Sequence, residues 1–259
     1  MKTILLSVGL MATSGLNVCA QVIISETFNY ANDAALAVNW TISASPITLN
    51  TTNGNPSPSV SNAATATAAN IWKGSTFSLT PTDAAPLRLS ADFFSPAVTA
   101  GAVTTVGLRT GANPLYEMGL YRTFDNIQTG PSTSDGPTTA STGIGTRTIN
   151  IGTDLPGQDW VKMADYFNGS ARFEATFTTF SVTTRIDIGI DGTWEFAFTE
   201  TGTTATGAFT DLRIHAPVAT AAGSGGTGVD NIVLQVIPEP SSLLLLGLGG
   251  SLALRRRRK

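Results

Sequence analysis

The acidic side chains of this sequence are the groups whose type and spacing could support chemistry. Asp187 and Asp191 lie four positions apart in the alternating segment "TTRIDIGIDG". Two carboxyl groups about 5–10 Å apart can hydrolyse a glycosidic bond, whereas four residues of extended strand separate this pair by roughly 13 Å. We therefore expect a solvated strand face here, and we assign no catalytic residue.

Other reaction classes have even less support in the sequence. The single histidine, His215, lies in "DLRIHAP", and there is no Gly-x-Ser-x-Gly segment to supply a nucleophile for a triad. We expect His215 to be a side chain on a sheet face. One histidine and one cysteine disfavour a zinc site, and no phosphate-binding glycine motif is present. An enzyme remains the alternative only if carboxylates meet from distant strands.

Sugar binding is a second chemical possibility, because exposed aromatic faces beside polar groups bind carbohydrate. Three aromatic residues are candidates for sugar contacts: Trp72, Tyr116 and Tyr121. The alternative for each of them is a place in the core or at its rim.

The elements that must position these residues are predicted to be β-strands. Apolar and polar residues alternate with period two, which is typical of strands with one buried face. The pattern occurs in "PLRLSADFF", "ARFEATFTTF", "TTRIDIGIDG", "TWEFAFTE", "TDLRIHA" and "VDNIVLQVI". It directs Trp194, Phe196 and Phe198 inward, and Asp191-Gly192 predicts a hairpin between two strands. Only Asn32–Trp40 indicates a short helical turn.

Three low-complexity stretches separate the predicted strands. They are Asn50–Asn70, Thr129–Thr146 and Ala216–Gly228, and they are rich in Thr, Ser, Gly and Ala. Such segments bury little apolar surface, so we expect mobile surface loops, with a binding face as the alternative. Many short strands with glycine-rich turns predict an all-β fold, a β-sandwich of the jelly-roll type.

The N-terminus has the layout of a secretory signal peptide. Lys2 precedes a short apolar run, and small residues precede a predicted cleavage between Ala20 and Gln21. Residues 1–20 are therefore expected to form a signal helix that is removed on export. The only cysteine, Cys19, would leave with it, so the mature protein would have neither a disulfide nor thiol chemistry.

The C-terminus combines an uncharged run, Ser241–Leu254, with the five cations of Arg255–Lys259. The run is expected to be a short hydrophobic helix, because a full membrane span needs about 20 residues. The cations would stay in the cytoplasm and leave the body outside. Together with Pro238-Glu239-Pro240, this order resembles the sorting tail of PEP-CTERM proteins. The resemblance implies that residues 238–259 anchor the chain transiently in the membrane, where exosortase recognises Pro-Glu-Pro and removes the tail.

Residues 21–237 form the body between these two ends, and we expect one domain there. Without Lys2, the five terminal cations and Glu239, the body keeps 9 basic and 17 acidic residues, a net charge of −8. Nucleic-acid affinity comes mainly from Lys and Arg on phosphates, so this charge disfavours a nucleic-acid partner.

A second resemblance lies at both ends of the body. "SETFNYANDAALAVNW" and "VDNIVLQV" resemble the opening and closing strands of concanavalin A-like (laminin-G-like) jelly rolls. The resemblance implies that these strands lie together, that carbohydrate is a possible ligand class and that a structural calcium can lie nearby. Calcium prefers oxygen ligands, so Glu26 and Asp230 are the candidate metal ligands; the alternative is that each caps a strand end.

These observations predict an exported, non-enzymatic protein of the cell surface or extracellular matrix that binds exopolysaccharide. The alternatives are a polysaccharide-degrading jelly-roll enzyme and a purely structural matrix protein without a specific ligand.

Overall fold

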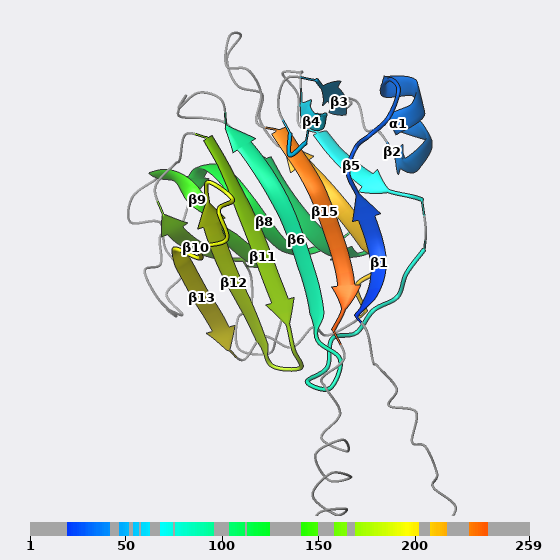
Figure 1. The fold of residues 1–259 in the computed structure, drawn as a ribbon. Helices are drawn as coiled ribbons and strands as arrows, with labels where there is room; N and C mark the ends of the chain where they lie inside the picture. Colours follow the sequence, from blue (N-terminus) through cyan, green and yellow to red (C-terminus); the bar gives the residue numbers. More distant parts are fainter. Residues whose placement is uncertain are drawn as a thin grey trace, which may run out of the picture.

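The fold is known from a computed structural model of the chain. The model describes residues 20–41, 47–51, 54–56, 58–62, 68–74, 76–95, 104–111, 113–124, 141–149, 158–164, 169–201, 208–216 and 228–237. Two antiparallel sheets pack face to face (Figure 1). The predicted all-β sandwich is therefore confirmed. The two terminal helices predicted from the sequence lie outside the described residues.

The larger sheet has eight strands in the order β13-β12-β11-β6-β15-β4-β3, and β1 pairs with β15. Their bounds are β1 (Gln21–Glu26), β3 (Ile47–Asn50), β4 (Ser59–Asn62), β6 (Leu87–Ser95), β11 (Gly169–Phe177), β12 (Ser181–Ile188), β13 (Phe196–Thr201) and β15 (Gly228–Val236). The first and last strands are thus neighbours, as the resemblance to concanavalin A-like domains implies.

The second sheet has seven strands in the order β10-β9-β8-β7-β14-β5-β2. Their bounds are β2 (Trp40–Thr41), β5 (Ala68–Trp72), β7 (Thr104–Thr110), β8 (Asn113–Phe124), β9 (Ser141–Ile149), β10 (Gln158–Ala164) and β14 (Asp211–Ala216). Helix α1 (Asp33–Asn39) confirms the predicted helical turn. The side chain of Asn32 caps this helix by accepting a hydrogen bond of 2.9 Å from the Ala35 amide. In the described part of the chain, no helix is long and apolar enough to cross a membrane.

The core lies between the two sheets and follows the period-two pattern of the sequence. Phe93 on β6 and Phe173 on β11 are fully buried, with their ring centroids 4.9 Å apart. Across the interface, Tyr116 on β8 packs edge-on against Phe177 at 4.8 Å. Because alternate residues point to opposite faces, the charged residues of these strands lie on the outer faces of the sandwich.

Two of the low-complexity stretches contain strands, which corrects their prediction as loops throughout. Asn50–Asn70 contains β4 and the first residues of β5, while Thr129–Thr146 contains the first residues of β9. Within the first stretch, β4 pairs with β3 and β15. The partner strands supply the hydrogen bonds that the composition of the stretch did not reveal.

The outer face of the seven-stranded sheet carries a buried ion pair across a glycine. In the strand register, Gly107 on β7 lies opposite Glu117 on one side and Arg213 on the other. The guanidinium of Arg213 contacts the Glu117 carboxylate, and both side chains are buried. Burial, followed by the positive charge of Arg109, lowers the pKa of Arg213 to about 10. His215 lies on the same face, with Nδ1 3.6 Å from Glu117 Oε1, as its predicted place on a sheet face requires.

Gly107 is expected to tolerate no larger residue. A Cβ added there would overlap the Tyr116 carbonyl oxygen and lie 2.7 Å from Glu117 Cγ. Overpacking of this kind should lower the free energy of unfolding of Gly107→Ala by about 3 kcal/mol, measured by urea denaturation. Ala197→Ser, which adds one atom at an exposed position of β13, is the control and should leave stability unchanged. Equal stability of Gly107→Ala and the wild type would contradict this account.

Candidate functional site

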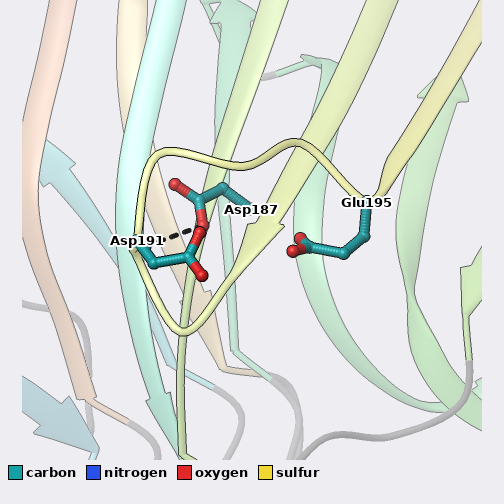
Figure 2. Close-up of side chains that lie close together, drawn as sticks. All are labelled: Asp187, Asp191 and Glu195. Carbon is teal, nitrogen blue, oxygen red and sulfur yellow. Dashed lines mark hydrogen bonds between the residues drawn. The ribbon is translucent and has the colours of Figure 1, made fainter.

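Two groups of acidic residues lie on the outer face of the eight-stranded sheet. The first, which we call the acidic loop group, consists of Asp187 at the end of β12 with Asp191 and Glu195 in the following loop (Figure 2). One carboxylate oxygen from each residue lies within 4.8 Å of the other two. Asp187 is buried, whereas Asp191 and Glu195 are exposed.

The close approach of Asp187 and Asp191 corrects the separation of roughly 13 Å that an extended strand would give. β12 ends at Ile188, and the chain reverses through Gly189 (φ 92°) and Ile190 (φ 57°). The two oxygens of Asp187 then accept hydrogen bonds from the amides of Asp191 at 3.0 Å and Gly192 at 2.9 Å. The predicted hairpin is confirmed, but its loop spans residues 189–195.

The remaining carboxylates of this group also hold the loop. Asp191 Oδ1 accepts from the Thr193 amide at 2.8 Å, and Glu195 Oε2 accepts from the Ile188 amide at 2.7 Å. Among the described residues, Asp191 Oδ2 and Glu195 Oε1 accept no hydrogen bond, so each exposed residue keeps one oxygen for solvent or a ligand.

Trp194 lies beside the acidic loop group on the outer face, which corrects its predicted inward orientation. Arg185 points outward from β12 because its neighbours Thr184 and Ile186 are buried. The Arg185 Cζ atom lies 3.9 Å from the centroid of the Trp194 ring. β13 begins only at Phe196, so the strand alternation that directs Phe196 inward does not extend back to Trp194.

The second acidic group is a buried pair on neighbouring strands. Asp230 on β15 lies directly opposite Asp92 on β6, and both residues are fully buried. Arg172 on β11 donates two hydrogen bonds to Asp92, from Nε at 2.7 Å and from Nη2 at 2.8 Å. Asn231 Nδ2 adds a third bond of 2.9 Å. Asp92 is therefore buried in an ion pair with Arg172.

Within the described residues, Asp230 has no cationic partner of this kind. Its oxygens accept from the amides of Asn55 at 2.9 Å and Asn231 at 2.7 Å. Asn231 adopts a left-handed conformation (φ 49°) in the irregular pairing between Asp230 and Val233. Burial raises the pKa of Asp230 to about 6. The negative charges of Asp92 and Glu26 also raise this pKa, whereas the hydrogen bonds from the two amides lower it.

Glu26, the other candidate metal ligand, ends β1 beside β15 and binds the segment that follows it. Its Oε1 accepts from the Phe28 amide at 2.7 Å, and its Oε2 accepts from the Tyr30 hydroxyl at 2.5 Å and the Trp40 indole at 3.3 Å. Burial and the bond to Glu26 raise the pKa of Tyr30. Glu26 is thus bonded to the side chains of Tyr30 and Trp40 and to the backbone amide of Phe28 in the opening segment.

The candidate sugar contacts have different environments. Tyr116 lies in the core, where its hydroxyl is 2.6 Å from Thr184 Oγ1, so the prediction of a sugar contact there is wrong. Trp72 is half-buried at the rim and packs edge-on against Trp40, with ring centroids 5.3 Å apart. Tyr121 belongs to β8, but its side chain lies outside the described part of the structure.

The processing sites fall at the borders of the described region. Gln21, the first residue after the predicted cleavage at Ala20, begins β1. The motif Pro238-Glu239-Pro240 follows the last described residue, Ile237, and is itself outside the described residues.

Sequence reasoning missed Asp92, Arg172, Asn231 and Trp194 as members of these groups. A signal for Asp92 and Arg172 existed, because both occupy polar positions of alternating segments. Their pairing depends on β6 and β11 being neighbours, which one sequence cannot reveal. No comparable signal marked Asn231 or the position of Trp194 over Arg185.

Comparison with solved structures identifies proteins with a similar fold. The CBM2 module of the evolved Dit protein of Lactobacillus casei BL23 phage J-1 superposes with a TM-score of 0.53 at 11% identity, covering 85% of this chain and 96% of that chain. Domain 4 of AbnA, a GH43 extracellular arabinanase from Geobacillus stearothermophilus, gives 0.47 at 13% identity, with 86% and 96% covered. Lectin II from Ulex europaeus gives 0.41 at 16%, with 76% and 92% covered. At 11% identity, the similarity to the CBM2 module supports the fold alone.

Comparison with curated protein sequences finds no match. One family matches the sequence, and it is described as the PEP-CTERM protein-sorting motif; the match covers residues 236–259. This range begins at the last residue of β15 and includes Pro238-Glu239-Pro240, the uncharged run and the terminal cations. The chain is thus a two-sheet β-sandwich whose last strand leads directly into a PEP-CTERM sorting motif.

Proposed function

We propose that this protein is exported, sorted by exosortase to the cell surface or extracellular matrix, and binds exopolysaccharide without changing it chemically. The observation that carries the proposal is the sorting motif at residues 236–259, which begins at the final residue of β15 in a β-sandwich. A CBM2 module has a similar sandwich fold, and this likeness is the reason for choosing carbohydrate as the proposed ligand class. In this proposal, residues 1–20 are the signal peptide, 21–237 the binding domain and 238–259 the sorting tail.

Two other functions compete with polysaccharide binding. The close approach of Asp187 and Asp191 favours a polysaccharide-degrading enzyme, since paired carboxyl groups act in glycoside hydrolysis. Both oxygens of Asp187 accept backbone hydrogen bonds, however, which supports a role in the loop. The third possibility is a structural matrix protein without a specific ligand. Incubating the purified full chain with a bound polysaccharide and assaying new reducing ends separates the binder from the enzyme.

The sorting part of the proposal predicts the fate of tail variants. Deleting residues 238–259 should release the protein into the medium, because neither the membrane segment nor the recognition motif remains. Replacing Pro238, Glu239 and Pro240 by alanine should instead leave unprocessed protein in the membrane fraction. Immunoblots of cell, membrane and medium fractions from a host with an exosortase measure both outcomes. An unchanged location of the deletion variant would refute sorting by the tail.

Calcium is the metal that we propose for this domain, with Glu26 and Asp230 as its candidate ligands. Each Asp230 oxygen accepts one hydrogen bond and keeps a lone pair, and the nearby carboxylates favour a cation. Glu26 fits less well, because calcium would compete with Tyr30 and Trp40 for its Oε2 atom. The acidic loop group is a second set of oxygen donors, so the metal test must separate the two places.

The raised pKa of Asp230 predicts how stability depends on pH in the absence of calcium. The folded protein binds this proton more tightly than the unfolded chain does, so the contribution is complete below pH 4 and is lost as the pH rises through about 6. The loss should be on the order of 2 kcal/mol, measured by urea unfolding at pH 4 to 7. Asp230→Asn should flatten this profile, whereas Asp191→Asn, at an exposed carboxylate, should not. An identical profile in wild type and Asp230→Asn would contradict the assignment.

Calcium binding at Asp230 should change that profile, because the metal stabilises the carboxylate over the protonated acid. Addition of calcium to chelator-treated protein should raise Tm at pH 7 and have little effect at pH 5. The increase should disappear in Asp230→Asn and persist in Asp187→Asn. Loss of the increase in Asp187→Asn alone would place the metal at the acidic loop group instead. No increase in the wild type would end the calcium proposal.

A further inference from the structure

The loop between β12 and β13 combines an aromatic ring with free hydrogen-bond acceptors. We propose that Trp194, Asp191 and Glu195 form a subsite for a neutral sugar unit of a polysaccharide. The inference rests on the proposed function and deepens it, since it names both the place of binding and the chemical class of the ligand.

The indole of Trp194 is held in place before any ligand arrives. Arg185 donates from Nε at 2.9 Å to Glu174 Oε1, and its Nη2 lies 2.7 Å from the same oxygen. Arg88 approaches that oxygen from β6 at 3.4 Å. The guanidinium is thereby fixed against the sheet, and it covers one face of the Trp194 ring at 3.9 Å. A fixed aromatic ring loses little conformational entropy on binding, which favours affinity.

The ring is also accessible in part. Trp194 is half-buried, and among the described residues Arg185 is its only charged or aromatic ring partner. Since Glu174 holds Arg185 down on the sheet, a ligand would approach the indole from the side away from this guanidinium. The apolar C–H face of a pyranose ring matches such a surface, as it does in sites that combine an aromatic ring with a few polar groups.

The adjacent carboxylates supply the polar part of the subsite. Asp191 and Glu195 are exposed, and each has one oxygen that accepts no hydrogen bond from the described residues. Their other oxygens are tied to the loop, so the free oxygens have fixed positions. Sugar hydroxyls are hydrogen-bond donors, and bonds to ionised acceptors are stronger than bonds between neutral groups.

The charge around Trp194 selects the class of sugar. Asp187, Asp191 and Glu195 contribute three carboxylates at this loop, while the nearby Arg185 is ion-paired with Glu174. The body as a whole is also acidic. A uronate or a sulfated sugar would be repelled here, since like charges brought together across an interface cost affinity. The ligand that fits is a neutral hexose or pentose unit with free hydroxyls.

The test is affinity electrophoresis of the full chain in gels containing soluble polysaccharides. The neutral probes are a mixed-linkage β-glucan, an arabinoxylan and a galactomannan, and the acidic probes are alginate and polygalacturonate. The wild type should bind at least one neutral polymer and neither acidic polymer. Trp194→Ala should weaken that binding about tenfold or more, because truncating a central aromatic contact usually costs at least this much. Asp191→Asn with Glu195→Gln should also weaken it.

Two controls separate a binding role from a folding role. Phe180→Ala removes an exposed aromatic ring (60% exposed) just before β12, at the other end of the strand, and should leave binding unchanged. Trp194→Phe keeps an aromatic face and should bind better than Trp194→Ala. Tm values close to that of the wild type in both Trp194 variants would exclude loss of folding as the cause.

The outcomes distinguish this inference from the proposed function. Neutral-polymer binding that survives Trp194→Ala would overturn the subsite and leave the proposed function in place. Binding only to alginate or polygalacturonate would overturn the neutral-sugar assignment. Loss of binding on addition of a calcium chelator would overturn direct contacts between the carboxylates and the sugar, and would indicate a metal-mediated site instead. Absence of binding to every probe would count against both the subsite and polysaccharide binding.

Discussion

The pairing of β15 with both β1 and β6 is the constraint on which most of this structure depends. It brings the last strand between segments that are distant in sequence and buries Asp230 opposite Asp92. Two buried carboxylates are costly unless they are satisfied, and Arg172, Asn231 and Asn55 provide the required hydrogen bonds. The irregular backbone at Asn231 is part of this solution, since it directs one residue to both carboxylates.

The ion pairs on the two outer faces of the sandwich differ in how far they are buried. On the seven-stranded sheet, Glu117 and Arg213 meet over Gly107 and are buried together. On the eight-stranded sheet, Arg172 and Arg185 remain partly exposed, while their carboxylate partners Asp92 and Glu174 are buried. A buried pair contributes little net stability, but removing either partner would leave an uncompensated buried charge. The outer face of the eight-stranded sheet presents aromatic and carboxylate groups that can contact a ligand.

Much of the fold followed from the period-two pattern, because burial of one face leaves a direct record in the sequence. β6, β11, β12 and β15 were predicted in this way, and so was the short helix α1. Apart from the pairing of β1 with β15 and the β12–β13 hairpin, the neighbours of the strands were not predictable, which is why the pairing of Asp92 with Arg172 was missed. The approach of Asp187 to Asp191 and the position of Trp194 were missed for a local reason: strand geometry stops at Ile188, and the hydrogen bonds of the loop take over. The sorting tail was recognisable because its order of motif, apolar run and cations does not depend on folding.

The direction of the strands places both ends of the body at the same pole of the sandwich. Gln21 and Val236 pair with each other at one pole of the eight-stranded sheet, while Asp187 lies toward the opposite pole, where Gly169 pairs with Ser95 (Figure 1). The chain therefore enters and leaves the sandwich at the same pole. If the proposed sorting tail tethers the body through the end of β15, the β12–β13 loop lies at the other pole, separated from the tethered pole by the length of β12, about 25 Å. Trp194 would then lie near the pole that is distant from the tether, on the lateral outer face of the eight-stranded sheet.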